Sequence, residues 1–189
     1  LLGVFVGQIV NTEVSKQLLD EVKYYSMDSD SLNIMLLLDP SPVFCSFYLE
    51  ESEKLEGRTW KIGNELEYLE KVKGVYDYEL KKEYFILETK SYLLSEKINL
   101  VCKTDKVNIL YFYSQDCEDC EKQGNVLDSL SPEFPEGKIA IYSFDGELGS
   151  TIVEGLKKKY SIYNYPSIVI DEKVFRGYKE KDELLNISE

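Results

Sequence analysis

The sequence contains no histidine among its 189 residues. A Ser-His-Asp triad, a Cys-His dyad and a zinc site built on imidazole ligands are therefore excluded. Cysteine is scarce as well, and 4 residues are too few for a small fold held together by many disulfides. These absences remove most hydrolases and metalloenzymes from the candidate functions.

Positive charge is also in short supply, because 22 Lys and Arg face 35 Asp and Glu, for a net charge of −13. This balance argues against nucleic acids and anionic membrane surfaces as partners. Hydrophobic residues make up 43% of the chain and aromatic residues 13%, which is unlike a disordered protein. We therefore expect a folded protein of one large or two small domains.

The first ten residues, Leu1 to Val10, form an apolar run that gives way to polar residues from Asn11. We interpret residues 1–11 as the remnant of a signal or membrane-anchor segment; a buried first helix is the alternative. Ten helical residues rise about 15 Å, whereas a membrane span needs roughly twenty residues. The anchor interpretation predicts an extracytoplasmic, membrane-anchored protein, and a cytoplasmic location is the alternative.

Residues 12–104 show the apolar spacing of α-helices. Pro40 and Pro42 interrupt this half most clearly, since proline disfavours helix before it and tolerates helix just after it. Gly74 predicts a second stop. The pattern predicts an all-α bundle of three or four antiparallel helices, with apolar residues at helical spacing in 13–25, 32–38, 42–74 and 80–102.

From residue 105 onward the pattern changes to strands alternating with helices. The stretch 103–106 is the predicted boundary, which gives a helical domain at 12–104 and an α/β domain at 105–189. The order βαβαββα requires right-handed crossovers, so the first two strands should be parallel and the last two antiparallel. The predicted strands are 107–113, 139–144, 167–170 and 173–176, and the predicted helices are 118–130, 150–160 and 180–187.

Cys117 and Cys120 form a CxxC motif that directly follows the first strand and begins a helix. A helix N-terminus carries unpaired N–H groups and partial positive charge, which favour the thiolate form of Cys117. Cys120 lies one turn further along the same face, where its thiol can attack a mixed disulfide at Cys117. These positions predict Cys117 as the nucleophile and Cys120 as the resolving thiol; a static disulfide is the alternative.

Residues 105–189 resemble a thioredoxin-like domain over nearly their whole length. The resemblance lies in the strand-CxxC-helix unit, in Tyr165-Pro166 before the third strand, in the final hairpin and helix, and in Gly177. It implies a cis Pro166 that packs opposite the CxxC motif and, with Tyr165, binds the client chain. It also implies thiol-disulfide exchange with protein thiols or disulfides and an upstream redox partner, without a cofactor.

The CxxC motif and the residues before it depart from that family at four positions. Glu118 and Asp119 stand between the cysteines, and their carboxylates oppose ionisation of Cys117, which favours a comparatively reducing couple. Tyr111 stands where thioredoxins usually bury an acid, and Asp116 where they usually have tryptophan. The residue that assists proton transfer is therefore left open, and the candidates are Asp116, Glu118 and Asp119.

The other two cysteines, Cys45 and Cys102, lie at the start of one predicted helix and the end of another. These ends can meet in an antiparallel bundle, so we predict a structural disulfide. On the chain-entropy model, closing a loop of about 57 residues contributes roughly 4 kcal/mol. Two unrelated buried thiols are the alternative.

Together these patterns predict a helical bundle followed by a thioredoxin-like domain that acts as a thiol-disulfide oxidoreductase on proteins. Two alternatives remain open. The fold can serve as a non-catalytic binding module whose CxxC stays oxidised, or as a structural ectodomain whose bundle dimerises.

Overall fold

The computed structural model describes residues 2–135 and 137–185, and their side chains from Thr12 onward. The chain forms two compact units that divide between Val101 and Cys102. Of the predicted anchor segment, Leu1 and the side chains of residues 2–11 lie outside this description. None of the helices in the described ranges combines the length and apolar character needed to cross a bilayer.

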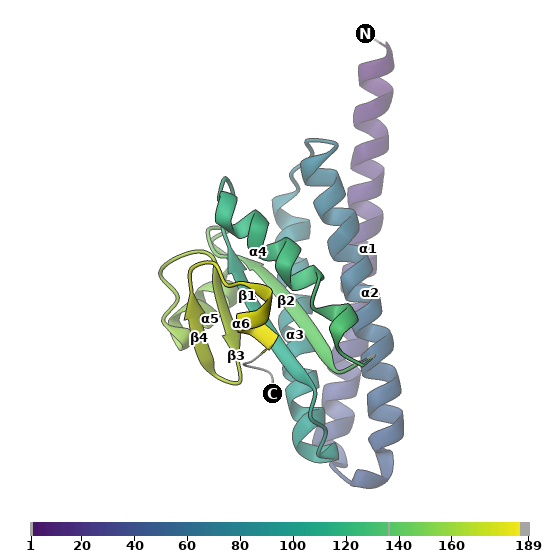
Figure 1. Ribbon diagram of the computed structural model, residues 1–189. Coiled ribbons are helices and arrows are strands. Elements are labelled where there is room, and N and C mark those ends of the chain that lie inside the picture. The colour runs from purple at the N-terminus through teal and green to yellow at the C-terminus, as the bar shows by residue number, and fades with distance from the viewer. Residues whose placement is uncertain (1, 136, 186–189) are drawn as a thin grey trace. The chain divides into compact units, whose positions relative to one another are not determined.

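The first unit consists of three α-helices, α1 (Leu2–Leu38), α2 (Cys45–Lys71) and α3 (Tyr78–Cys102), which alternate in direction (Figure 1). A short 3-10 turn, η1 (Pro42–Phe44), precedes α2, and the Ser41 side chain accepts a hydrogen bond from the Val43 N–H at 3.3 Å. The two apolar runs 13–25 and 32–38 belong to the single helix α1, because neither glycine nor proline separates them.

Apolar side chains from all three helices form the core of this unit. A buried ion pair joins α2 to α3, because Lys81 Nζ lies 2.9 Å from Glu70 Oε2 and only 2% of Lys81 is exposed. Lys90 joins α3 to α1 by donating to Ser26 Oγ and Asp30 Oδ2, both at 2.8 Å. The core includes Leu18, Val22, Leu32, Leu36, Tyr48, Leu55, Ile62, Leu66, Leu80, Leu87, Leu94 and Ile98.

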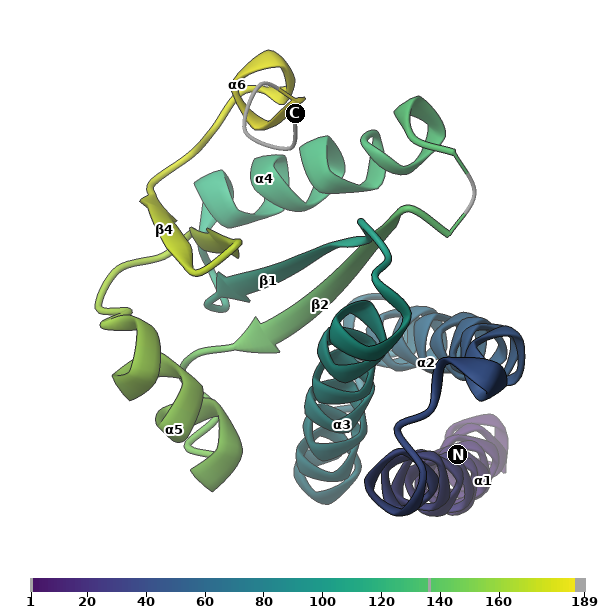
Figure 2. The same ribbon diagram turned by 90° about the horizontal axis from the view of Figure 1, so that it is seen from below.

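The second unit is a four-stranded sheet of order β2-β1-β3-β4 with helices on both faces. Strands β1 and β2 are parallel, and the β1–β3 and β3–β4 pairs are antiparallel, which confirms the predicted parallel pair and hairpin. Helices α4 and α6 cover one face and α5 the other (Figure 2). The elements are β1 (Val107–Tyr113), α4 (Glu118–Asp128), η2 (Ser131–Glu133), β2 (Ile139–Asp145), α5 (Thr151–Tyr160), β3 (Ser167–Ile170), β4 (Lys173–Arg176) and α6 (Lys181–Leu185).

The strands form where apolar residues run together. Five consecutive residues of β1 and all four of β3 are buried, as expected for strands covered on both faces. On the α4 and α6 side, Ile109 and Ile168 pack in one cluster with Leu127 and Leu184. Asp171 and Glu172 both have positive φ, 48° and 64°, the conformation of a tight turn between antiparallel strands. This arrangement is a thioredoxin-like fold.

Two glycines of α2 provide a matched test of the packing in the first unit. A Cβ at Gly63 would overlap the Tyr84 hydroxyl, which donates to buried Glu88, whereas a Cβ at Gly57 meets nothing within 4 Å. We expect Gly63→Ala to lower the free energy of unfolding by about 1–3 kcal/mol. Gly57→Ala should raise it by about 0.5–1 kcal/mol. Urea unfolding measures both, and equal effects would contradict the described α2–α3 packing.

Candidate active site at the Cys117–Cys120 disulfide

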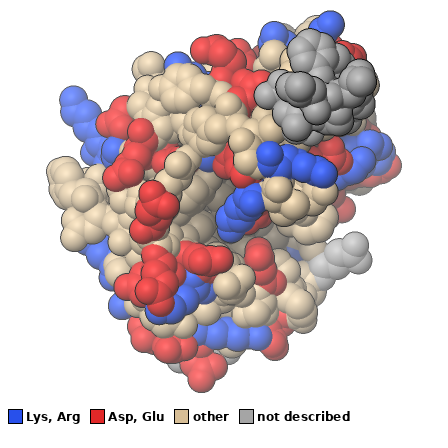
Figure 3. All heavy atoms as spheres, turned by 90° about the horizontal axis from the view of Figure 1, so that it is seen from above, with Lys and Arg blue, Asp and Glu red and all other residues tan. Residues whose placement is uncertain are grey.

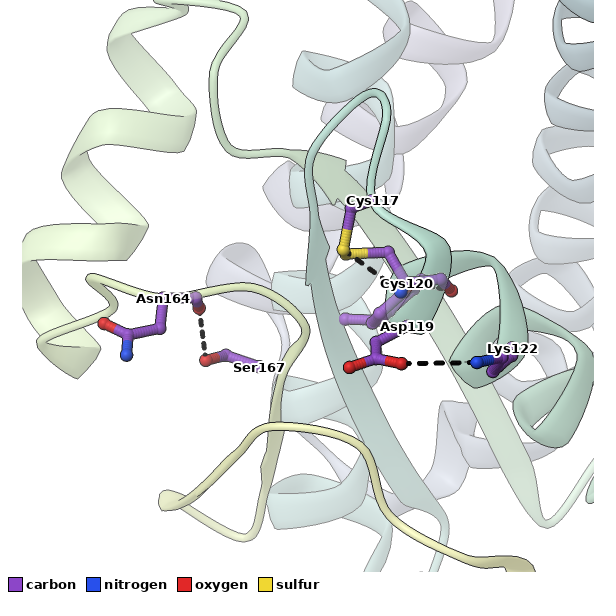
Figure 4. The surroundings of a disulfide bond; sticks show 7 residues. Cys117, Asp119, Cys120, Lys122, Asn164 and Ser167 are labelled. Atoms are coloured by element: carbon purple, nitrogen blue, oxygen red, sulfur yellow. Dashed lines mark hydrogen bonds and ion pairs between the residues drawn. A yellow bond between two sulfur atoms is a disulfide. The ribbon is translucent and has the colours of Figure 1, made fainter.

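Cys117 is the N-cap residue of α4 and uses its sulfur as the capping atom. The Cys120 N–H donates to Cys117 Sγ at 3.1 Å, so the first turn of the helix directs an N–H group at this sulfur. Cys117 and Cys120 are joined in a disulfide (Figure 4). The hydrogen bond from this N–H and the helix dipole both stabilise the thiolate form of a sulfur at this position.

The two sulfur-bearing residues differ in exposure. Cys117 is half-buried, whereas only 4% of Cys120 is exposed. An incoming thiol or disulfide can therefore reach Cys117 more readily than Cys120. The roles of Cys117 as nucleophile and Cys120 as resolving thiol stay a prediction, and this difference in exposure favours them.

The Tyr165–Pro166 peptide bond is cis, as the resemblance implied. Because Ser167 of β3 pairs with Phe112 of β1, Pro166 lies beside the end of β1, where the chain leaves the sheet toward Cys117. The Ser167 hydroxyl donates to the Asn164 carbonyl at 2.7 Å and closes this turn, which borders the disulfide in Figure 4. Pro166 is buried and Tyr165 is half-buried.

The carboxylates between the cysteines share a partner that the sequence analysis missed. Lys122 Nζ lies 2.8 Å from Glu118 and 3.6 Å from Asp119, and its hydrogen bond and charge lower the pKa of Glu118. The i,i+4 spacing of Glu118 and Lys122 is the signal that could have identified this pair. Glu121 adds a third carboxylate to the first turn, so one ammonium offsets three negative charges only in part.

Tyr111 occupies the position at which the resembled family usually has a buried acid. Its hydroxyl donates to the Cys120 carbonyl at 2.6 Å. Burial, with a smaller contribution from the charge of Asp128, raises the pKa of this hydroxyl above its ordinary value. Tyr111 therefore remains protonated at neutral pH, and its hydroxyl holds the backbone of Cys120 by this hydrogen bond.

Asp145, at the end of β2, is the buried carboxylate of the second unit within residues 102–135 and 137–185. It pairs in register with Tyr113, which places it at the same edge of the sheet as the Cys117 loop. Its Oδ1 accepts from the Glu147 N–H at 3.0 Å, and its Oδ2 accepts from Gln115 at 3.4 Å. Sequence reasoning did not single out Asp145, because an acid at a strand end is more often exposed.

Tyr165 is packed against a glycine and a lysine. A Cβ at Gly146 would overlap the Tyr165 ring, and Lys157 Nζ lies 5.9 Å from the ring centroid. Lys157 also donates to the Gly146 carbonyl at 2.6 Å and pairs with Glu154 at 2.8 Å. Burial opposes the charge on Lys157, but Glu154 and Tyr165 outweigh burial and raise its pKa. These contacts orient the residue before Pro166.

Cys45, the first residue of α2, and Cys102, the last residue of α3, are both disulfide-bonded. The alternative interpretation required two free buried thiols, and neither cysteine is one.

Across the part of the chain that the structure describes, no group of three or more His, Cys, Asp or Glu side chains is arranged to hold a metal.

Acidic and basic side chains are interspersed on the molecular face drawn in Figure 3. Around the disulfide, however, the nearest charges along the chain are Asp116, Glu118 and Asp119, which are all exposed. The surface beside Cys117 therefore carries negative charge on the side of α4.

No family model and no curated protein matches the chain. Among the solved structures that match about half of it are several thioredoxins. Thioredoxin-2, a component of malaria parasite protein secretion machinery, is 21% identical, with 43% of this chain and 80% of that chain covered and a TM-score of 0.36. The Deadhead thioredoxin of Drosophila melanogaster is 19% identical, with 50% and 89% covered and a TM-score of 0.36. Chloroplastic thioredoxin z is 17% identical, with 50% and 85% covered and a TM-score of 0.38.

The carboxylates beside Cys117 yield a testable prediction about its acidity. In the reduced protein, Glu118→Gln combined with Asp119→Asn removes two negative charges near the thiol and frees Lys122. We expect the pKa of Cys117 to fall by about half a unit, because a thiolate is disfavoured by neighbouring negative charge. Thiolate absorbance against pH measures this shift.

Glu133→Gln is the control for this experiment, since Glu133 lies in η2 beyond the far end of α4 and pairs with Lys181 at 2.6 Å. It should leave the pKa of Cys117 unchanged. A double variant whose thiol titrates at the same pH as the wild type would show that the two carboxylates do not act on the sulfur.

Proposed function

We propose that the protein is a thiol-disulfide oxidoreductase that acts on disulfides of other proteins. The supporting observation is the half-buried Cys117 at the N-terminus of α4, bonded to a Cys120 that is almost fully buried. This arrangement separates the group that meets the client from the group that completes the reaction. It supplies both thiols that a two-step exchange requires.

The reaction proceeds in two balanced steps. The thiolate of reduced Cys117 attacks one sulfur of a client disulfide, forms a mixed disulfide and releases the other client sulfur as a thiolate that takes up a proton. Cys120 then loses its proton and attacks the Cys117 sulfur, which forms the intramolecular disulfide and releases the second client thiolate. Two electrons pass from the protein to the client, and an upstream dithiol partner restores the reduced form.

The residues around the disulfide have distinct parts in this proposal. The first turn of α4 stabilises the Cys117 thiolate through the Cys120 N–H. Tyr165 and Pro166 provide the backbone edge against which the client chain lies. The carboxylates of Glu118 and Asp119 raise the free energy of the thiolate, which favours the disulfide form and a protein that donates electrons.

A non-catalytic binding module is the second candidate, and Tyr111 is the observation that favours it. The tyrosine stands where an acid would assist proton transfer, and burial keeps its hydroxyl protonated. In that case the same edge at Pro166 would hold a client while Cys117 and Cys120 stay bonded.

Reduction of insulin by dithiothreitol separates the two candidates. The oxidoreductase proposal predicts that the wild type accelerates the reaction and that Cys117→Ser abolishes the acceleration, because no attacking thiolate remains. Cys120→Ser should also lose turnover and accumulate a mixed disulfide with the client, visible by non-reducing electrophoresis. Equal rates for Cys117→Ser and the wild type would favour the binding module.

We also propose that the protein works outside the cytoplasm, with residues 1–11 as the remnant of a signal or membrane-anchor segment. The bonded state of Cys45 and Cys102 supports this location, because such disulfides persist in oxidising compartments. Fractionation of expressing cells should place the protein outside the cytosol, with both cysteines resistant to alkylation until a reductant is added. Recovery in the cytosol with both thiols reduced would contradict the proposal.

A further inference from the structure

Gln123 lies on α4, three residues after Cys120, and its side chain is completely buried. Both ends of its amide bind the backbone of the same distant residue. The Lys179 N–H donates to Gln123 Oε1 at 2.7 Å, and Gln123 Nε2 donates to the Lys179 carbonyl at 3.3 Å. The side chain thus pairs with Lys179 much as a neighbouring strand would.

Lys179 belongs to a segment that also contacts the cis proline. Two residues earlier, the Gly177 N–H donates to the Pro166 carbonyl at 2.9 Å. Gly177 has a φ of +73°, which a residue with a side chain rarely adopts. Residues 177–179, here called the strap, are therefore bonded to Pro166 at one end and to α4 at the other.

We propose that Gln123 is a positioning residue that holds Pro166 in place relative to Cys117 through the strap. This inference rests on the proposed function. Cys120 and Gln123 lie in α4 and Cys117 is its N-cap, whereas Pro166 directly precedes β3. The strap therefore connects Pro166 to α4 in addition to the sheet. A client that lies against Pro166 then presents its disulfide to Cys117 in a fixed geometry.

The chemistry of the side chain distinguishes positioning from packing. Methionine fills nearly the same volume as glutamine but can neither donate nor accept these two bonds. Gln123→Met therefore keeps the packing of α4 and leaves the Lys179 N–H and carbonyl without their partners. A residue that only fills space would tolerate the change without an effect on client binding.

The test compares a protein client with a small disulfide, using the full chain. Insulin must lie against Pro166, whereas 5,5′-dithiobis(2-nitrobenzoate) needs only access to Cys117. We expect Gln123→Met to raise the KM for insulin about five- to tenfold, since a displaced Pro166 binds the client chain less tightly. The kcat for insulin and the rate with the small disulfide should stay within about twofold of the wild type.

Leu127→Ala is the matched control. Leu127 lies one turn further along α4 in the hydrophobic cluster and does not bond to the strap, so this variant loses stability without losing the two hydrogen bonds. It should keep the wild-type KM for insulin. If Leu127→Ala raises KM as much as Gln123→Met, or if Gln123→Met leaves KM unchanged, the positioning role is overturned.

Gln123→Glu provides a second variant if the methionine protein does not fold. When ionised, the carboxylate still accepts from the Lys179 N–H, but its other oxygen faces the Lys179 carbonyl without a proton to donate. We expect an intermediate rise in KM of about two- to threefold, and an unchanged KM would overturn the proposal. A wild type that reacts with the small disulfide but never with insulin would overturn the proposed function as well. A wild type that reduces insulin with the same KM as Gln123→Met would overturn only the positioning role of Gln123.

Discussion

The antiparallel pairing of β1 with β3 is the constraint on which the candidate site depends. The register places Phe112 opposite Ser167, so the chain that leaves β1 toward Cys117 and the chain that enters β3 from Pro166 meet at one edge of the sheet. A shift by one residue would turn the buried side chains of β3 to the opposite face, away from the cluster formed with α4 and α6. The apolar core therefore fixes the register, and the register brings the disulfide and the cis proline together.

At this edge two electrostatic effects oppose each other at one sulfur atom. The N-terminus of α4 and the Cys120 N–H stabilise negative charge on Cys117, whereas Glu118, Asp119 and Glu121 in the same turn disfavour it. Lys122 offsets the carboxylates only in part, because it carries one charge against three. In the proposed function, this balance favours the disulfide form of the couple.

The sequence predicted most of the second unit because its signals are local. The strands 107–113, 167–170 and 173–176 were predicted with their observed bounds, since apolar runs and a two-residue turn mark their ends. The CxxC motif at a helix start and the proline before β3 were equally visible. In the first unit, α1 was harder to delimit, because an apolar pattern does not tell whether two neighbouring runs share one helix.

The parts of the site that the sequence did not predict depend on contacts between distant residues. Gln123 and Lys179 are 56 residues apart, and a lone glutamine in a helix gives no indication that both ends of its amide bind one backbone residue. The contact between Gly146 and the Tyr165 ring is invisible for the same reason. Helix and strand periodicity predicts which face of an element is buried, but not which partner a buried polar group finds.

The reduction potential of the Cys117–Cys120 couple can be measured by equilibration with dithiothreitol or glutathione buffers, and it decides whether the protein donates electrons. We predict a reversible two-electron couple near the value of about −270 mV that is typical of thioredoxin. A potential near the roughly −120 mV of strongly oxidising members of this fold would contradict it. So would a disulfide that does not exchange with either buffer.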